Sequence, residues 1–202
     1  MSSELLQNLN PGIADLHPYE PGRSIDEVML AYGHTEVIKL ASNENPLGAS
    51  PKALAKIDSL PDSFHLYPDG NGTKLKNVIA QHEKLLSENI ILGNGSNEIL
   101  EFIVRANVDN KSEVIIPKHS FLVYEIISKL QNAKIITTKP DNDKTSENYL
   151  GINLESVKEK ITKDTRLIFI ANPANPTGTY IDLLDIDKFL QLVPKNTSVI
   201  ID

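Results

Sequence analysis

Four loops of the sequence carry residue types that suit binding of a small polar ligand. The stretch "LGNGSNEIL" places Ser96 and Asn97 directly behind two glycines. Backbone N–H groups at a helix start, with glycines that allow close approach, form anion-binding sites. Further along the chain, "PKHSFLVYEI" contains Phe121, "ANPANPTGTY" contains Asn175, and "SVIID" ends in Asp202. These loops offer an anion cradle, an aromatic ring, an amide and a carboxylate.

Each of these residues also has an ordinary structural explanation. A glycine turn capped by Ser96 is common in proteins. Phe121 can lie flat on a planar ligand or can be a core residue. Asn175, between two prolines, can donate an amide hydrogen bond to a ligand or close an Asx-turn. Asp202 can keep a heterocyclic nitrogen protonated, but a single Asp indicates little. For each residue considered alone, the ligand-binding role and the structural role both stay open.

Strands and helices alternate through the second half of the chain. Near-continuous apolar runs predict strands at residues 89–93, 112–117, 133–140, 166–171 and 197–202. Periodic apolar segments predict helices at residues 96–108, 120–132, 153–161 and 181–194. This alternation predicts crossover units on a mostly parallel sheet with both faces covered, which is an α/β/α sandwich. Ligands collect beyond the carboxyl ends of such strands, where the four loops begin.

The first half of the chain shows a different pattern. "LHPYEPG" predicts an extended arm, because its prolines and glycine oppose a helix. A short helix is predicted at residues 25–33 and a short strand at residues 37–41. Ser50, followed by Pro51, is a typical helix start, and a second loop-to-helix segment occupies residues 64–86.

The combination of the four loops is more specific than any one of them. They occur in a fixed order along one predicted α/β sheet, each just after a strand. Together they predict a site for a planar, phosphorylated ring that contains nitrogen, and pyridoxal phosphate fits this description.

Several longer motifs resemble those of a known family. The segments "LASNENPLGASPKAL", "YPDGNGTKLKNVIA", "ILGNGSNEILE", "HSFLVYE", "ANPANPTGT" and "VIID" are similar to the successive motifs of histidinol-phosphate aminotransferases. These are class I/II, fold-type I enzymes that depend on pyridoxal phosphate. The resemblance runs from about residue 16 to residue 202. It implies an N-terminal arm and small-domain segment at residues 1–46 and the start of the large, cofactor-binding domain at residues 47–202.

The resemblance also implies roles for individual residues. Ser96 and Asn97 would bind the cofactor phosphate, and Phe121 would stack on the pyridine ring. Asn175 would bind the 3-oxygen of the ring, and Asp202 would pair with the ring nitrogen. Three further residues would act at the dimer interface or on the substrate. Tyr67 would reach the partner subunit's cofactor phosphate, Tyr19 would help to bind the substrate phosphate, and Asn43 would line the substrate site.

One family feature is missing from these 202 residues. The Schiff-base lysine of the family, in a Ser-Lys context, has no counterpart here, so no catalytic residue is assigned in this chain. We therefore expect the chain to be the N-terminal part of such an enzyme or a truncated version of it. By itself it is expected to be inactive and poorly stable or prone to aggregation, because an unpaired sheet edge would be exposed.

Composition excludes several other classes. The chain contains no cysteine, which excludes disulfides and thiolate metal sites, and no metal site is expected. The net charge of −7 and the lack of a Lys/Arg block argue against a nucleic-acid surface. No signal peptide or membrane-spanning apolar run is evident. These observations predict a cytoplasmic protein that acts on small molecules.

The resemblance predicts the reaction of the complete protein. Glutamate would give its amino group to the cofactor and leave as 2-oxoglutarate, and imidazole-acetol phosphate would then become L-histidinol phosphate in a homodimeric enzyme of histidine biosynthesis.

Three alternatives stay open. The protein can be another fold-type I aminotransferase or decarboxylase with an aromatic or phosphothreonine substrate. It can be a non-catalytic fragment that binds a phosphorylated ligand, or a nucleotide-binding α/β protein, although no Walker lysine is present.

Overall fold

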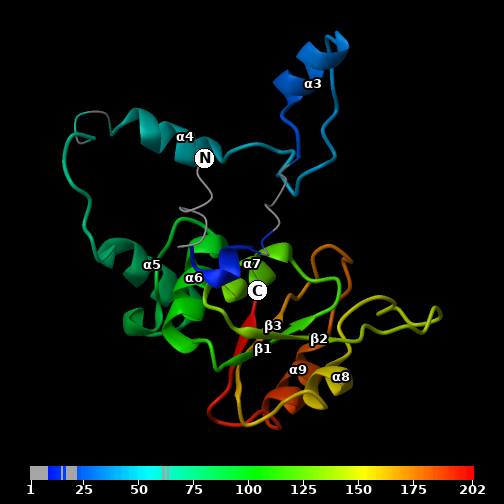
Figure 1. Cartoon of the computed structure of the whole chain (residues 1–202). Helices are drawn as coiled ribbons and strands as arrows, with labels where there is room; N and C mark the ends of the chain where they lie inside the picture. Colours follow the sequence, from blue (N-terminus) through cyan, green and yellow to red (C-terminus); the bar gives the residue numbers. More distant parts are fainter. Residues whose placement is uncertain (1–8, 15, 17–21, 61, 63) are drawn as a thin grey trace. The chain divides into compact units, whose positions relative to one another are not determined.

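The computed structural model divides the chain into two compact units. The sheet unit contains residues 1–19 and 93–202, and the helical unit contains residues 20–92. The structure describes residues 9–14, 16, 22–60, 62 and 64–202 (Figure 1). The expected boundary between residues 46 and 47 stays a prediction.

The sheet unit is built on four parallel strands. They are β1 (Glu113–Pro117), β2 (Lys134–Thr138), β3 (Thr165–Ile170) and β4 (Ser198–Ile201). Their order across the sheet is β2-β1-β3-β4, and every neighbouring pair is parallel. The chain therefore moves outward from β1 to β2 and then crosses back to β3 on the other side of β1. This confirms the predicted parallel sheet, and it places all four carboxyl ends at one edge.

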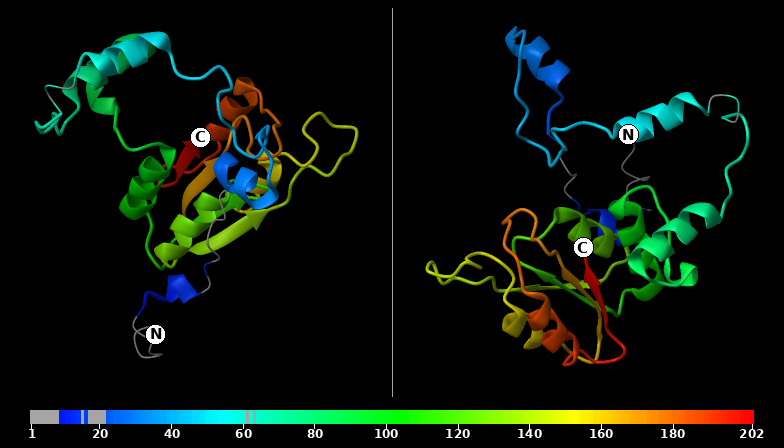
Figure 2. Two further views of the ribbon diagram at one scale, coloured as in Figure 1. Left: turned by 90° about the horizontal axis from the view of Figure 1, so that it is seen from above. Right: turned by 180° about the vertical axis from the view of Figure 1, so that it is seen from behind.

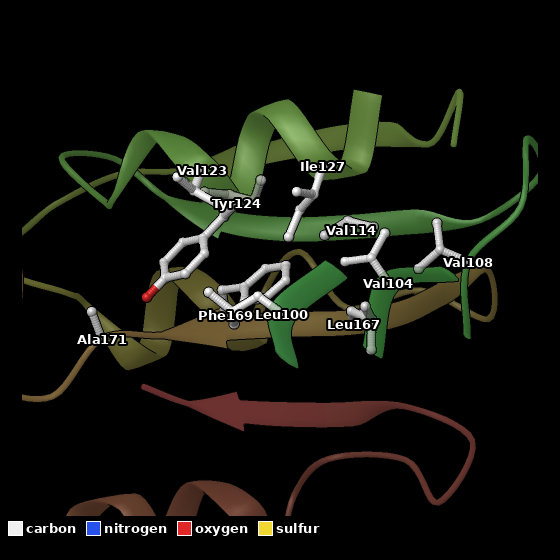
Figure 3. Packing of buried hydrophobic residues seen from close by; sticks show 11 residues of the cluster. Leu100, Val104, Val108, Val114, Val123, Tyr124, Ile127, Leu167, Phe169 and Ala171 are labelled. Carbon is white, nitrogen blue, oxygen red and sulfur yellow. The ribbon is translucent and has the colours of Figure 1, made fainter. Parts of the chain in front are cut away.

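Helices cover both faces of this sheet (Figures 1 and 2). The helices α6 (Ser96–Asn107) and α7 (Leu122–Leu130) pack with the β-strands in one apolar cluster, whereas residues of α8 (Leu154–Lys158) and α9 (Leu183–Leu190) belong to a second cluster. Burial is nearly continuous along β1 and β3, as expected for strands covered on both sides. Figure 3 shows the first cluster, in which Leu100 and Val104 of α6 lie one turn apart. The predicted three-layer α/β/α architecture is confirmed.

The short helix α2 (Pro11–Ala14) packs closely against the end of α7. A Cβ atom added to Gly12 would lie 1.9 Å from the backbone carbonyl oxygen of Lys129, so only glycine fits at this contact. The Asn10 side chain donates a hydrogen bond of 2.9 Å to the carbonyl of Leu130 and accepts one from the Gly12 N–H. These contacts attach the N-terminal segment to the sheet unit.

The helical unit contains α3 (Ile25–Tyr32), α4 (Pro51–Asp58), α5 (Thr73–Glu83) and the 3-10 turn η2 (Ser87–Asn89). The Ser24 side chain caps α3 by accepting the N–H of Glu27, and Gly33 ends that helix with a φ of 69°. Pro51 begins α4 as predicted. In the described part of the whole chain, no helix is long and apolar enough to cross a membrane.

Two predicted strands are wrong. Residues 37–41 and 89–93 form no strand, although Ile90 has an extended backbone. A strand needs a neighbour to share its ladder of hydrogen bonds, and these two segments have none among the described residues. Their apolar side chains are largely exposed, including Ile38, Leu40 and Ile91.

A buried acid lies at the amino-terminal edge of the sheet. Glu113 is only 7% exposed; it accepts hydrogen bonds from Lys134 Nζ at 2.7 Å and from Thr162 Oγ1 at 2.5 Å. The hydrogen bond from Lys134, followed by that from Thr162, lowers the pKa of Glu113, and together they outweigh the opposing effect of burial. Because its pKa is lower in the folded state, Glu113 stabilises the fold above its ordinary pKa, and this stabilisation disappears as the pH falls through the folded value.

Replacing Glu113 by Gln should therefore lower the free energy of unfolding by about 1 kcal/mol near neutral pH, since the charged hydrogen bonds to Lys134 and Thr162 are weakened. The difference from the wild type should shrink as the pH falls below 4.5, the ordinary pKa of the group. Urea unfolding at a series of pH values measures both effects. A difference that stayed constant with pH would contradict this assignment.

Candidate active site

The start of α6 is open on the side where an anion is expected. Gly95 has a φ of 80°, and a Cβ placed there would meet no atom within 4 Å. Ser96 and Asn97, the first two residues of the helix, are exposed. The carboxylate of Glu98 turns back and accepts the N–H of Asn94 at 2.6 Å, which fixes the loop before the helix. The N–H groups of Ser96 and Asn97 belong to the first helical turn, where intrahelical partners are lacking.

Phe121 lies four residues after the end of β1, as the N-cap of α7. It is half-buried, and its ring meets the edge of the Tyr124 ring at a centroid distance of 5.8 Å and an interplanar angle of 88°. A hollow of about 170 Å³ beside it is lined by residues at the carboxyl ends of β1 and β2 and by the loop that follows β1. One part of Phe121 therefore packs on the core while the rest faces this edge of the sheet.

Asp202 follows β4 and is held by Tyr124. The Tyr124 hydroxyl donates a hydrogen bond of 2.5 Å to Asp202 Oδ2. The phenol is fully buried and stacks on Phe169 with centroids 4.4 Å apart and planes 5° from parallel. In Figure 3 its hydroxyl points out of the apolar cluster on the side of Ala171. Burial, followed by the hydrogen bond to Asp202 and the charge of that residue, raises the pKa of Tyr124, so its hydroxyl stays protonated.

Sequence reasoning did not single out Tyr124. Its three-residue spacing from Phe121 in "SFLVY" was the available signal, because residues three apart in a helix can meet on one face.

The two asparagines of the loop after β3 have different roles. The Asn172 side chain binds both backbone groups of Ile181, accepting its N–H at 2.8 Å and donating to its carbonyl at 3.0 Å. Asn175 is exposed, and no hydrogen bond of its side chain to another described residue is found. Both Asn-Pro peptide bonds are cis, and Gly178 closes the turn by donating its N–H to the carbonyl of Ala174. Asn172 therefore organises the loop, and Asn175 is presented to the outside.

This division of roles predicts opposite outcomes for the same substitution. Asn172→Ala should lower the free energy of unfolding by about 1–3 kcal/mol, because the N–H and carbonyl of Ile181 lose their partner. Asn175→Ala is the matched control and should leave stability unchanged. Thermal and urea unfolding of the two variants provide the test; equal losses in both would show that the assignment of roles is wrong.

The structure brings some of the expected site residues together. Phe121 contacts Tyr124, which binds Asp202, and the Asp202 carbonyl accepts the N–H of Asn172 at 2.9 Å. The start of α6 is linked to this group less directly: Leu100, one turn into the helix, packs in the same apolar cluster as Tyr124. Among the described residues, no hydrogen bond joins Ser96 or Asn175 to Asp202.

The remaining expected residues lie elsewhere. Tyr67 and Asn43 belong to the helical unit and are exposed, and the structure does not determine the position of that unit relative to the sheet unit. Tyr19 lies outside the described residues. Their roles stay predictions.

A larger hollow, of about 780 Å³, lies between the segments at residues 141–154 and 178–185. Its wall carries four carboxylates, those of Asp141, Glu147, Asp182 and Asp185. Clustered negative charge repels a phosphate group. Size alone therefore does not identify the anion site, and the open start of α6 suits a phosphate better.

Comparison with known proteins decides the family. Residues 35–202 match the family model described as "Aminotransferase class I and II". The chain belongs to this family. Among curated aminotransferases, "Histidinol-phosphate aminotransferase 2" of Pseudomonas fluorescens (strain Pf0-1) is 40% identical over 206 residues, covering 100% of this chain and 53% of the relative. "Histidinol-phosphate aminotransferase 1" of Mannheimia succiniciproducens is 40% identical over 197 residues, covering 98% of this chain and 52% of the relative.

Solved aminotransferase structures share the fold. A histidinol-phosphate aminotransferase from Sinorhizobium meliloti, solved in complex with pyridoxal-5'-phosphate, matches with a TM-score of 0.82 and 22% identity, covering 96% of this chain and 50% of that structure. The histidinol-phosphate aminotransferase from Clostridium acetobutylicum matches with a TM-score of 0.68 and 30% identity, covering 80% of this chain and 45% of that structure. This aminotransferase chain thus spans about half the length of the curated relatives it matches.

Proposed function

We propose that the complete protein to which this chain belongs is a pyridoxal-phosphate-dependent histidinol-phosphate aminotransferase. It exchanges the amino group between glutamate and imidazole-acetol phosphate, with 2-oxoglutarate and L-histidinol phosphate as the other pair. The names of the relatives at 40% identity support this substrate. The observation that carries the proposal is the Asp202 carboxylate, fixed by Tyr124 at the carboxyl edge of a parallel sheet.

The residues present fit the proposed cofactor. The exposed carboxylate of Asp202 suits a protonated ring nitrogen, and Phe121 supplies an aromatic surface nearby. The exposed amide of Asn175 suits the ring 3-oxygen. At the start of α6, the open space at Gly95 leaves room for a phosphate beside Ser96 and Asn97.

The protein groups have separate tasks in this mechanism. When bound, pyridoxal phosphate would supply an aldehyde carbon that receives the amino group and a ring that accepts electrons. Asp202 holds a proton at the ring nitrogen, because a nearby negative charge favours the cationic form. Ser96 and Asn97 hold the phosphate, and Asn175 orients the ring by its 3-oxygen. We assign no lysine of this chain the role of the Schiff-base nucleophile, and we propose that the chain by itself is inactive.

Several features of the complete protein belong to the same proposal. We propose a homodimer in which Tyr67 reaches the partner subunit's cofactor phosphate, while Tyr19 and Asn43 bind the substrate. The motif resemblance supports these three roles. Cytoplasmic location is proposed on the same basis, together with the absence of cysteine from the sequence.

The test is to purify the complete protein with pyridoxal phosphate and compare its substrates. We expect glutamate formation from L-histidinol phosphate and 2-oxoglutarate to be far faster than from phenylalanine and 2-oxoglutarate. Asn175→Ala should weaken cofactor binding without loss of stability. A preference for phenylalanine would support the alternative of an aromatic aminotransferase. A protein that binds no pyridoxal phosphate would overturn the proposal.

A further inference from the structure

We propose that Tyr124 is a positioning residue, which orients the Asp202 carboxylate toward the ring nitrogen of the cofactor. This inference rests on the function proposed above, and it assigns a task to a side chain that the binding site itself does not use. Tyr124 lies on α7, inside the apolar cluster shown in Figure 3. Its hydroxyl donates a hydrogen bond to Asp202.

The phenol ring of Tyr124 has no freedom to point elsewhere. One of its faces stacks on Phe169 at 4.4 Å, and the ring of Phe121 approaches at a near-perpendicular angle. The residue is fully buried. Ser128 Oγ, which is also buried, donates a hydrogen bond of 2.7 Å to the backbone carbonyl of Tyr124 and not to its ring. Close packing of this kind fixes a side-chain rotamer. The hydroxyl is therefore aimed at one place, which is Asp202 Oδ2.

The backbone of Asp202 is bonded to β3 and to the loop after it, and its side chain is bonded to α7. Its N–H donates to the carbonyl of Ile170 on β3 at 3.0 Å, and its carbonyl accepts the N–H of Asn172 at 2.9 Å. These bonds fix the main chain, but they leave the side chain free to rotate about its own bonds. The hydrogen bond from Tyr124 on α7 removes that freedom. Since Oδ2 receives the phenol, Oδ1 is left to receive the N–H of a ring nitrogen.

The hydrogen bond from Tyr124 keeps the carboxylate directed at the ring nitrogen. Without this donor, the orientation of the Asp202 side chain would be less well fixed. A carboxylate that points away favours the cationic ring nitrogen less, because the attraction between opposite charges falls with distance. The ring nitrogen then moves toward its unprotonated form, which weakens the electron-accepting ring.

The first experiment needs no bound cofactor. In the complete protein with cofactor removed, NMR should show the Tyr124 hydroxyl proton far downfield and protected from exchange with water. Asp202→Asn should move this resonance upfield, because an amide oxygen is a weaker acceptor than a carboxylate. A resonance that is not affected by Asp202→Asn would overturn the inference.

The second experiment uses the protein loaded with cofactor whose ring nitrogen carries an NMR label. Tyr124→Phe keeps the stacked ring and should shift the nitrogen resonance toward the unprotonated position. We expect kcat to fall about tenfold, as for the loss of one hydrogen bond to a charged group, while KM stays unchanged. Ser128→Ala is the matched control: it removes a buried hydroxyl beside Tyr124, but it leaves the phenol in place, and it should change neither kcat nor the nitrogen resonance.

The outcomes separate this inference from the proposed function. If the wild-type protein transaminates L-histidinol phosphate and Tyr124→Phe leaves the nitrogen resonance and kcat unchanged, the inference is wrong and the function stands. If Tyr124→Phe and Ser128→Ala reduce kcat equally, Tyr124 is only a packing residue. If the wild-type protein binds no cofactor, the proposed function is overturned, and the positioning role is overturned with it.

Discussion

Replacing Asp202 by Asn in the complete protein is expected to lower kcat for transamination about 10²–10³-fold, the usual loss when one charge-stabilising group is removed from an active site. Asn has nearly the same shape and can still accept the Tyr124 hydroxyl, so the fold should persist. The negative charge is lost, however, and the ring nitrogen is no longer favoured as a cation. Steady-state kinetics with L-histidinol phosphate and 2-oxoglutarate measures the effect.

The matched control is Asp185→Asn. Asp185 lies on α9, in the acidic wall of the larger hollow, and its partner is the exposed Lys188 at 2.8 Å. This variant removes the same charge from the protein and should retain full activity. If Asp202→Asn were as active as Asp185→Asn, the assignment of Asp202 to the ring nitrogen would have to be abandoned.

Replacing Phe169 by Ala should produce the largest loss of stability, with the free energy of unfolding reduced by about 3–5 kcal/mol. Phe169 is the next-to-last residue of β3, is fully buried, and supports one face of the Tyr124 ring. Its removal leaves a cavity on one face of the sheet and takes away the stacking partner of Tyr124. Urea unfolding of the complete protein provides the measurement.

Phe102→Ala is the control for this substitution. Phe102 is on α6 and is 45% exposed, so the same truncation there should cost much less. The prediction has a second part, since the Tyr124 ring depends on Phe169 for its position. Phe169→Ala should also weaken the protection of the Tyr124 hydroxyl proton from exchange. Similar stability losses in the two variants would contradict the packing argument.

The sequence was sufficient to predict the sheet because its signals are local. Continuous apolar runs such as the one at residues 114–117, bounded by turns and followed by amphipathic helices, indicate buried parallel strands. The segments at residues 37–41 and 89–93 have similar composition, but they form no strand. Whether an apolar run becomes a strand depends on a neighbour, and pairing is not encoded in the run itself.

The choice of candidate site residues rests on a related argument. Ser96, Phe121, Asn175 and Asp202 were selected because each follows an expected strand, and ligands gather at that edge. Their roles stay predictions, and the strand expected before Ser96, at residues 89–93, is not formed. Tyr124 was missed because it has the helical spacing of a core residue, and its hydrogen-bond partner lies 78 positions away. Asn172 and Asn175 each begin an Asn-Pro pair, and the hydrogen bonds of Asn172 to the backbone of Ile181 show that it has a structural role.

The buried Glu113, with its partners Lys134 and Thr162, has a practical consequence for protein engineering. It lies at the opposite end of β1 from Phe121, and a five-residue strand separates the two ends by about 13 Å. Substitutions around Glu113 can therefore adjust thermal tolerance without moving the groups proposed to hold the cofactor. A search for heat-resistant variants should begin at this edge of the sheet, because substitutions there can raise stability with the least effect on catalytic activity.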